Sequence, residues 1–343
     1  MNRQRVLMIA TSKKTKGGIT AVLNIYEKFP FWDKYHVKWL ETHSDGSNFH
    51  KLMFAIKAYF ISLTIIPRYS IIHIHLSEAP SLVRKLPLFL YSKLWGKKTV
   101  IHFHTNTINN TFFPLYKFVF KNANAVITLS RSVRDWVISS LGAKKECIVI
   151  YNPCRQVNTL NIEKEKIVLY AGVLNKKKGY IDLIEAFAQT TKEYPDWTLV
   201  LAGNGEIKQG KEYAKKSGIE DLVIFPGWIT GEEKHNLFSK ASIFCLPSYA
   251  EGFPTAILDA CSYGIPFITT PVGGIPDIVI DGKNGYLFHP GDIVELKEKI
   301  SLLMGSTLQR QKLGHAAKDL SQNTFGQKKI NEELDKLYQG LLN

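Results

Sequence analysis

Residues 243–274 constrain the fold more than any other part of this chain. The short apolar run 243–246 predicts a buried strand. A loop ending in Pro254 follows, and because proline suits the first turn of a helix, we predict a helix over residues 255–263. A second apolar run, 267–270, predicts the next strand. This order of elements is typical of a parallel sheet covered by helices.

Two acidic residues frame the predicted helix. Glu251 lies just before its N-terminus and Asp259 lies within it, so up to about 12 Å separates them along the axis. The free N–H groups and the positive end of the helix dipole near Thr255 favour phosphate. The pattern suits one carboxylate at each end of a nucleotide-sugar, with the diphosphate on the helix start. The spacing alone is equally consistent with a loop acid and a solvated helix acid.

The rest of the chain repeats the alternation of apolar runs and helical patterns. Predicted strands span residues 5–11, 36–42, 71–76, 99–103, 125–129, 147–150 and 167–171. Predicted helices span residues 20–28, 50–67 and 80–95, and others begin near 292, 307 and 327. Since a chain of 343 residues is long for one core, we predict an α/β protein with two domains of roughly 150 to 180 residues.

Gly17 and Gly18 follow the first predicted strand and precede a predicted helix, as at the start of a Rossmann-like unit. The motif GxGxxG is absent, so the pattern does not indicate a dinucleotide site. A plain tight turn is the alternative interpretation of this glycine pair.

The excess of positive over negative charge is confined to the first half of the chain. The net charge is +14, and residues 1–155 hold 23 Lys and Arg against 7 Asp and Glu, whereas the remainder is close to neutral. This asymmetry indicates a polyanionic partner for the first half, either nucleic acid or an anionic membrane face. The four cysteines show no metal-binding or redox spacing, which favours buried thiols in a reducing compartment.

Three segments of the first half combine large aromatic residues with lysine and arginine: 51–68, 81–98 and 111–124. Helices at a membrane interface need both, because aromatics enter the headgroup boundary and cations contact anionic lipid. The alternative is a core face with a solvated basic rim. We expect no signal peptide and no membrane span, since the longest apolar run, 58–67, lies between Lys57 and Arg68 and is too short.

Histidines gather at the ends of two predicted strands, His73 with His75 and His102 with His104. Ligands of open α/β sheets bind beyond the carboxyl ends of the strands, which favours His104 as a site residue. A zinc site built from these histidines would lack an acidic partner, so none is predicted. Ser130, after the strand 125–129, is predicted to cap a helix.

The stretch from Glu251 to Phe288 resembles the signature of glycosyltransferase family 4, retaining enzymes with the GT-B fold. That signature has two acidic residues separated by seven others, then a strand, a glycine-rich turn and Gly-x-x-Gly before an apolar pair. Glu251 and Asp259 match the acidic positions, and Gly282 and Gly285 match the last glycines.

The resemblance implies two Rossmann-like parallel-sheet domains facing a central cleft. The N-terminal, acceptor-binding domain would span residues 1–155 and the nucleotide-sugar-binding domain residues 156–325, with a polar linker at 156–166. A last helix over 326–343 would cross back and pack on the first domain.

The resemblance also implies the site residues. Glu251, His104 and Lys178 would be catalytic, with Glu251 and His104 contacting the sugar and Lys178 the diphosphate. Asp259 would contact the ribose. The implied donor-binding residues are Gly17, Gly18, Gly172, Gly203, Gly205, Gly227, Trp228, Ile229, Gly252, Phe253, Pro254, Thr255, Asp259, Gly273 and Gly274. No metal or cofactor is expected, because no Asp-x-Asp occurs and the nucleotide-sugar is a substrate.

Two positions depart from the family pattern. Asp259 stands where the family usually has glutamate, which shortens the carboxylate by one methylene. Val173 stands where the family has an arginine that grips the diphosphate, and Lys176 or Lys177 could substitute only as a point charge. The second departure makes a degenerate, inactive relative one possible interpretation.

Another glycine pattern is misleading. Gly205, Gly210 and Lys211 mimic a phosphate-binding P-loop, but Glu212 takes the place of the Ser or Thr that holds Mg²⁺. The glycines are also expected to lack a helix directly behind them. The sequence therefore does not favour an NTPase.

Together these features predict a retaining hexosyltransferase that moves sugar from a nucleotide diphosphate donor to a glycan or lipid-linked acceptor. Polysaccharide or lipopolysaccharide synthesis on the inner face of the cytoplasmic membrane is the expected setting, with the basic domain on anionic lipid. The rival hypotheses are a nucleotide-sugar 2-epimerase of the same fold and a nucleic-acid-binding module. The interleaved strands and the donor signature argue against nucleic acid.

Overall fold

The computed structural model describes residues 4–105, 108–143, 146–157 and 163–343. The chain divides into two compact units, Met1–Pro153 together with Gln327–Asn343, and Cys154–Gly326. Part of the predicted linker at 156–166 lies outside the described residues.

Unit 1 is built on a six-stranded parallel sheet with the order β2-β1-β3-β4-β5-β6. Its strands are β1 (Val6–Ala10), β2 (Lys38–Glu41), β3 (Ile71–Leu76), β4 (Lys98–Phe103), β5 (Ala125–Thr128) and β6 (Glu146–Val149). Every residue of β1, β3 and β5 is buried. Such strands lie inside a sheet covered on both faces, as the unbroken apolar runs predict.

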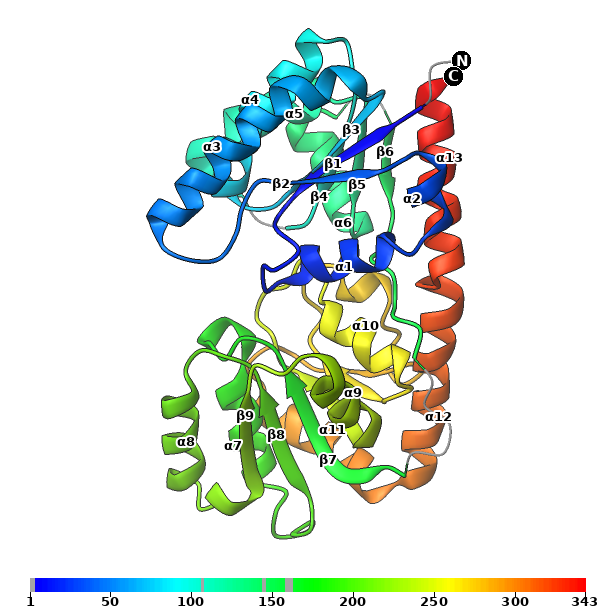
Figure 1. Cartoon of the computed structure of the whole chain (residues 1–343). Helices are drawn as coiled ribbons and strands as arrows, with labels where there is room; N and C mark the ends of the chain where they lie inside the picture. Colours follow the sequence, from blue (N-terminus) through cyan, green and yellow to red (C-terminus); the bar gives the residue numbers. More distant parts are fainter. Residues whose placement is uncertain (1–3, 106–107, 144–145, 158–162) are drawn as a thin grey trace. The chain divides into compact units, whose positions relative to one another are not determined.

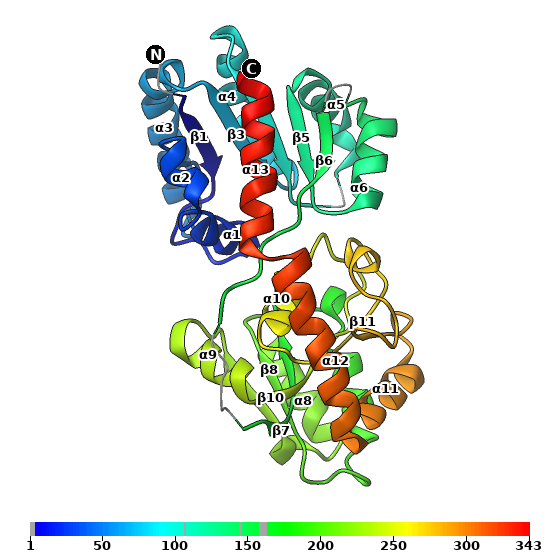
Figure 2. The same cartoon turned by 90° about the vertical axis from the view of Figure 1, so that its right-hand side faces the viewer.

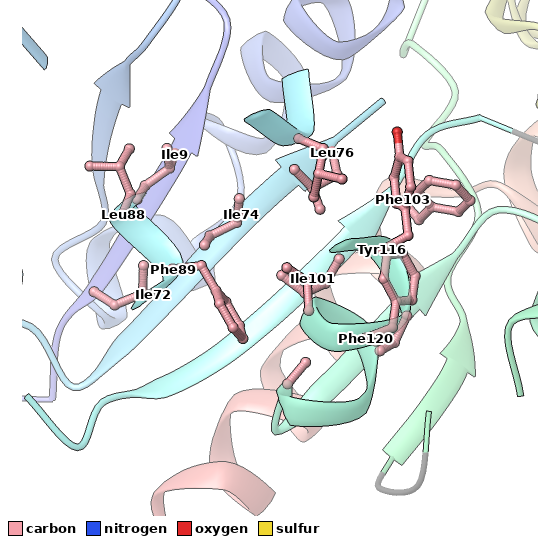
Figure 3. Packing of buried hydrophobic residues seen from close by; sticks show 14 of the residues in the cluster. Ile9, Ile72, Ile74, Leu76, Leu88, Phe89, Ile101, Phe103, Tyr116 and Phe120 are labelled. Carbon is pink, nitrogen blue, oxygen red and sulfur yellow. The ribbon is translucent and has the colours of Figure 1, made fainter. Parts of the chain in front are cut away.

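Two helical layers cover this sheet. The helices are α1 (Gly18–Tyr26), α2 (Pro30–Lys34), α3 (Asn48–Ile65), α4 (Ala79–Leu94), α5 (Phe113–Asn122), α6 (Arg131–Trp136) and α13 (Gln327–Leu342). One core joins β3 and β4 to α4 and α5 through residues such as Ile74, Phe89 and Phe120 (Figure 3). The second core lies on the opposite face, where α13 covers the strands (Figure 2). Ile330, Leu334 and Leu337 of α13 are buried there.

Unit 2 contains a second six-stranded parallel sheet with the order β12-β11-β10-β7-β8-β9. The strands are β7 (Glu165–Ala171), β8 (Thr198–Ala202), β9 (Val223–Gly227), β10 (Ala241–Leu246), β11 (Phe267–Thr269) and β12 (Tyr286–Leu287). Its helices are α7 (Tyr180–Ala188), α8 (Ile207–Lys216), α9 (Gly231–Lys240), α10 (Thr255–Ser262), α11 (Ile293–Gly305) and α12 (Thr307–Asp319). The predicted strand, helix and strand around residues 243–274 are β10, α10 and β11.

The prediction that no helix lies directly behind the P-loop-like glycines is wrong, because α8 begins at Ile207 and contains Gly210 and Lys211. A Cβ atom on Gly210 would lie 2.7 Å from the ring of Phe225. Glycine is therefore needed where this helix packs closely against β9. A long-range contact explains Gly210, whereas the sequence shows only its spacing.

The expectation that no segment can span a membrane also needs correction. Among the described residues, α3 and the following turn, Asn48–Arg68, form one helix long and apolar enough to do so by length and composition. Counting only uninterrupted apolar residues missed it, because Lys51 and Lys57 interrupt the run. In this structure α3 packs on the sheet through Ala58 and Ile65.

Candidate functional site

The candidate site of unit 2 lies at the carboxyl ends of four neighbouring strands, β11, β10, β7 and β8. The loop after β7 contains Gly172 and Lys178, and the loop after β10 contains Glu251. The loop after β8 begins at Gly203, and the turn after β11 contains Gly273. Ligands of parallel α/β sheets bind at this end, where the loops of adjacent strands converge.

Glu251 is the centre of a buried polar contact. Its Oε1 atom accepts hydrogen bonds from Lys178 Nζ at 2.6 Å and from Ser248 Oγ at 2.7 Å. The Glu251 side chain is only 7% exposed, so both contacts hold the carboxylate in one place. The ion pair joins two loops that are far apart in the chain. Ser248 was not predicted, and its place three residues before Glu251 is a weak signal.

Further contacts hold these two loops together. The Asn175 side chain accepts a hydrogen bond from the Lys178 backbone N–H and so caps the short 3-10 turn Lys176–Lys178. The Tyr249 N–H donates to the Lys177 carbonyl at 2.8 Å, and the Tyr249 hydroxyl donates to Asp182 at 2.7 Å. The position of Lys178 relative to Glu251 therefore depends on backbone contacts as well as on the ion pair.

Gly273 approaches the backbone that carries Glu251. Its φ is +60°, and a Cβ atom there would lie 1.9 Å from the Glu251 carbonyl oxygen. The next residue, Gly274, donates its N–H to the Gly252 carbonyl at 2.8 Å. Glycine is required at 273 because any side chain would collide with the loop of the candidate site.

The loops after β7 and β8 also lie in direct contact. The Gly172 N–H donates to the Ala202 carbonyl, and the Leu174 N–H donates to the Asn204 carbonyl at 2.7 Å. A Cβ atom on Gly203 would lie 1.7 Å from the Gly172 carbonyl oxygen. Val173 is half exposed between these contacts, and its carbonyl accepts a hydrogen bond from Tyr170.

Asp259, in α10, is held by two basic residues. One carboxylate oxygen accepts a hydrogen bond from Lys234 of α9, and the other lies 3.7 Å from Arg155 Nε. Neither cation was predicted, because Lys234 and Arg155 stand in segments without a local motif. The carboxylate is nearly buried, so a ribose hydroxyl would share it with these cations.

The N-terminus of α10 lies between the two acids in the chain. Pro254 precedes the helix, and no side chain caps it. The ring of Phe253 is buried and packs against Phe325 at 5.8 Å, so that side chain belongs to the core. Backbone N–H groups from Thr255 onward are therefore the groups that this segment offers to an anion.

Gly227 is the last residue of the edge strand β9, and Trp228 and Ile229 follow it. Gly227 has a φ of +81° and pairs with Ala202, the last residue of β8. The turn predicted to contact the base therefore neighbours the loop of Gly203. Ile229 is buried, and the Trp228 side chain contacts other residues of the protein.

Gly205 of unit 2 pairs with Leu174, whereas the other predicted residues belong to unit 1. Gly17 directly precedes α1 and Gly18 begins it, after the loop that follows β1. His104 follows β4, and its Nε2 atom lies 2.8 Å from Nδ1 of His75. Ser130 caps α6 by accepting a hydrogen bond from the Val133 N–H, which confirms the predicted cap.

Two further contacts involve the histidines. His73 Nδ1 lies 2.6 Å from the Tyr338 hydroxyl, and His73 Nε2 lies 3.3 Å from His102 Nδ1. One nitrogen from each of His73, His75 and His102 lies within 4.8 Å of the others, so these residues are grouped closely enough to hold a metal ion. Burial lowers the pKa of His73 and of His104 to about 3, so both rings are neutral near pH 7.

This cluster predicts a loss of stability in acid. The unfolded chain binds a proton at His73 below about pH 6.5, whereas the folded chain does so only near pH 3, so stability falls as the pH drops between these values. His73 alone should cost about 2 kcal/mol between pH 7 and pH 5. Urea unfolding at both pH values measures the loss, which His73→Gln should reduce and the exposed control His315→Gln should leave unchanged. An equal loss in His73→Gln and the parent would contradict the prediction.

Two family models match consecutive parts of the chain. Residues 155–320 match glycosyl transferases group 1, and residues 28–155 match glycosyltransferase family 4. Together they cover most of both units. The chain belongs to glycosyltransferase family 4. This confirms the family inferred from the motif around Glu251, and it establishes the protein as a transferase enzyme.

Relatives of this family 4 glycosyltransferase agree with that assignment. An uncharacterized glycosyltransferase of Methanocaldococcus jannaschii is 28% identical over 83% of this chain and 82% of its own length. The Campylobacter jejuni α-1,4-N-acetyl-D-galactosaminyltransferase, named for a diphosphate-undecaprenol-linked glycan, is 30% identical over 56% of this chain and 54% of its own. A capsular polysaccharide biosynthesis glycosyltransferase of Staphylococcus aureus is 25% identical, covering 67% of this chain and 66% of its own. Several relatives thus align over only half to two thirds of their length.

Solved structures establish the fold. Sucrose-phosphate synthase of Thermosynechococcus elongatus has a TM-score of 0.81 at 19% identity and covers 99% of both chains. The Anabaena protein HepE, solved with UDP-glucose, has a TM-score of 0.76 at 19% identity and covers 98% of this chain and 99% of its own. The family 4 enzyme described here therefore has the predicted GT-B α/β fold.

Proposed function

We propose that this enzyme transfers a sugar, with retained anomeric configuration, from a nucleotide diphosphate-sugar to a glycan or lipid-linked acceptor in cell-surface polysaccharide or lipopolysaccharide synthesis. The observation that carries the proposal is the buried Glu251–Lys178 ion pair directly before the N-terminus of α10. It holds a carboxylate suited to sugar hydroxyls beside a cation suited to a diphosphate. The glycan-linked and capsular relatives support the class of acceptor.

In the proposed reaction the bond between the anomeric carbon and the diphosphate oxygen breaks, and its electron pair leaves with the nucleoside diphosphate. The acceptor hydroxyl forms the new bond on the same face, and its proton passes to the departing phosphate oxygen. Lys178, the first N–H groups of α10 and the Gly273 amide would stabilise the charge that develops there, whereas the Gly274 amide already donates to the Gly252 carbonyl. No protein nucleophile and no metal ion is required by this scheme.

The two acids would take different parts of the donor. Glu251 would orient the sugar hydroxyls, while Asp259 would contact the ribose beside Lys234. Val173 leaves no guanidinium after β7, so Lys178 carries more of the diphosphate charge than in relatives with arginine at that position. His104 would contact the sugar, as the family resemblance implies.

A thermal-shift series with UDP-, GDP- and ADP-sugars tests donor binding. A donor at 100 times its Kd should stabilise the folded protein by about 2.7 kcal/mol, and the others should not. The structure solved with UDP-glucose makes that donor the first to test. No shift with any of these sugars would contradict the proposal.

A second measurement separates the transferase from the 2-epimerase. The bound donor is incubated with and without an acceptor preparation, and both products are analysed. A changed sugar nucleotide released from donor alone would identify an epimerase, whereas transfer only with acceptor supports our proposal. Binding without any turnover, restored in Val173→Arg, would instead identify a degenerate transferase.

A further inference from the structure

Three helices of unit 1 form one layer on the same side of the sheet: α3, α4 and α5 (Figure 1). Hydrogen bonds join the first two, since the Tyr59 hydroxyl donates to the Arg84 carbonyl at 2.7 Å and the Tyr91 hydroxyl to the Leu63 carbonyl at 3.0 Å. The rings of Phe89 in α4 and Phe118 in α5 are 6.4 Å apart. The outward sides of these helices therefore belong to one continuous layer.

That outward side is rich in exposed apolar side chains. Phe60 is 69% exposed and Leu94 is 81% exposed, values unusual for such large residues. The exposed apolar positions are 49, 52, 53, 60 and 63 on α3 and 83, 90 and 94 on α4, so at 3.6 residues per turn they lie along one stripe of each helix. We call the following set the docking face: Phe49, Leu52, Met53, Phe60, Leu63, Val83, Leu90, Leu94, Leu115 and Phe118.

The same part of the chain is almost free of negative charge. Residues 46–134 contain twelve Lys and Arg but a single acidic residue, Glu78, which precedes the first turn of α4. Exposed lysines accompany the apolar stripes on α3 and α5, where Lys57, Lys117 and Lys121 are exposed. A surface of this composition needs a partner that offers both apolar volume and negative charge.

We propose that the docking face binds an anionic phospholipid bilayer surface, with the apolar stripes entering the headgroup boundary and the lysines contacting lipid phosphates. Such a bilayer supplies both requirements at once. A second copy of the chain would bring two basic layers together, and nucleic acid offers no volume for Phe49 or Phe60. Trp95, half exposed at the end of α4, suits the interfacial region.

The bilayer would be the inner face of the cytoplasmic membrane, where a lipid-linked acceptor is available. The docking inference does not depend on the transfer reaction, because lipid binding is measured without donor or acceptor. Failure of one proposal is therefore distinguishable from failure of the other.

Sedimentation of the full-length protein with vesicles tests the inference. Binding is compared on phosphatidylcholine alone and on phosphatidylcholine mixed with phosphatidylglycerol, and we expect it only with the anionic lipid. Phe49→Ser/Leu52→Ser/Phe60→Ser should weaken binding at least about tenfold by removing apolar contacts. Lys57→Gln/Lys117→Gln/Lys121→Gln should also weaken it at least about tenfold by removing charge.

Unit 2 provides a matched control for the apolar variant. Val294, Leu302 and Leu308 are also exposed large apolar residues, on α11 and α12, so replacing all three with serine lowers surface hydrophobicity at a site away from the docking face. The control should bind vesicles as the parent does. The proposal would be overturned if the control and the Phe49→Ser/Leu52→Ser/Phe60→Ser variant lost vesicle binding equally. It would also be overturned if the parent bound vesicles equally well with and without phosphatidylglycerol.

A spectroscopic measurement gives an independent result. Lipids brominated near the headgroup should quench part of the tryptophan fluorescence of the parent, and this part should disappear in Trp95→Phe. Sedimentation without vesicles tests for a second copy on the same face. If the parent formed a dimer that Phe49→Ser/Leu52→Ser/Phe60→Ser abolished, and lipid did not quench its fluorescence, the docking face would be assigned to self-association instead.

Discussion

Replacing Glu251 with glutamine is expected to lower kcat/KM for sugar transfer by on the order of 10²- to 10³-fold. Glutamine is nearly the same size, but it removes the charge that faces Lys178 at 2.6 Å. The sugar hydroxyls lose a charged acceptor, and Lys178 loses the partner that positions it for the diphosphate. Steady-state kinetics with the donor found by thermal shift measures the change, and we expect most of it in kcat.

A second acid–base pair of unit 2 supplies the control. Lys166 and Asp196 form an ion pair with both side chains more than half exposed, near the amino ends of β7 and β8. Exposed pairs contribute little, so Asp196→Asn should keep full activity and nearly full stability. If Glu251→Gln retained parental kcat/KM while remaining folded, Glu251 would have no role in the reaction.

Gly273→Ala is expected to lower both the stability of unit 2 and the activity. Alanine at a φ of +60° costs about 1–2 kcal/mol by itself. Its Cβ would also lie 1.9 Å from the Glu251 carbonyl oxygen, so the loop that carries Glu251 must shift. Because a displacement of about 1 Å can cost 10²-fold in rate, we expect a loss of about that size in kcat/KM.

Gly282→Ala separates the cost of the backbone conformation from the effect of the contact with Glu251. Gly282 has a φ of +71°, close to that of Gly273, but a Cβ atom there would meet no atom within 4 Å. This variant should show the conformational cost alone, with the activity unchanged. Urea unfolding and kinetics on both variants make the comparison, and equal effects on activity would refute the importance of the contact with Glu251.

Several features of the site were accessible from the sequence because they depend on neighbours along the chain. Strands such as β1 and most of β10 appear as unbroken apolar runs, and the start of α10 appears from Pro254. The family resemblance added Lys178 and Gly273 to Glu251 as site residues. These inferences needed only local pattern, and the structure places all three residues at the same end of the unit 2 sheet.

Other features required the three-dimensional structure. The two cations around Asp259 and the packing of Gly210 against Phe225 join residues that no local period connects. The exposure of Phe60 likewise cannot be inferred from composition, because a buried apolar helix face and an exposed one contain the same residue types.

The sequence by itself determined many of the elements, their parallel arrangement, the family and the uneven charge, since each follows from residue type and short-range spacing. The tertiary structure decided which partner each charge has and which apolar face remains uncovered. The physical reason is that burial and ion pairing depend on distances between residues far apart in the chain, such as Lys178 and Glu251. Those distances exist only after the sheet has brought its loops together.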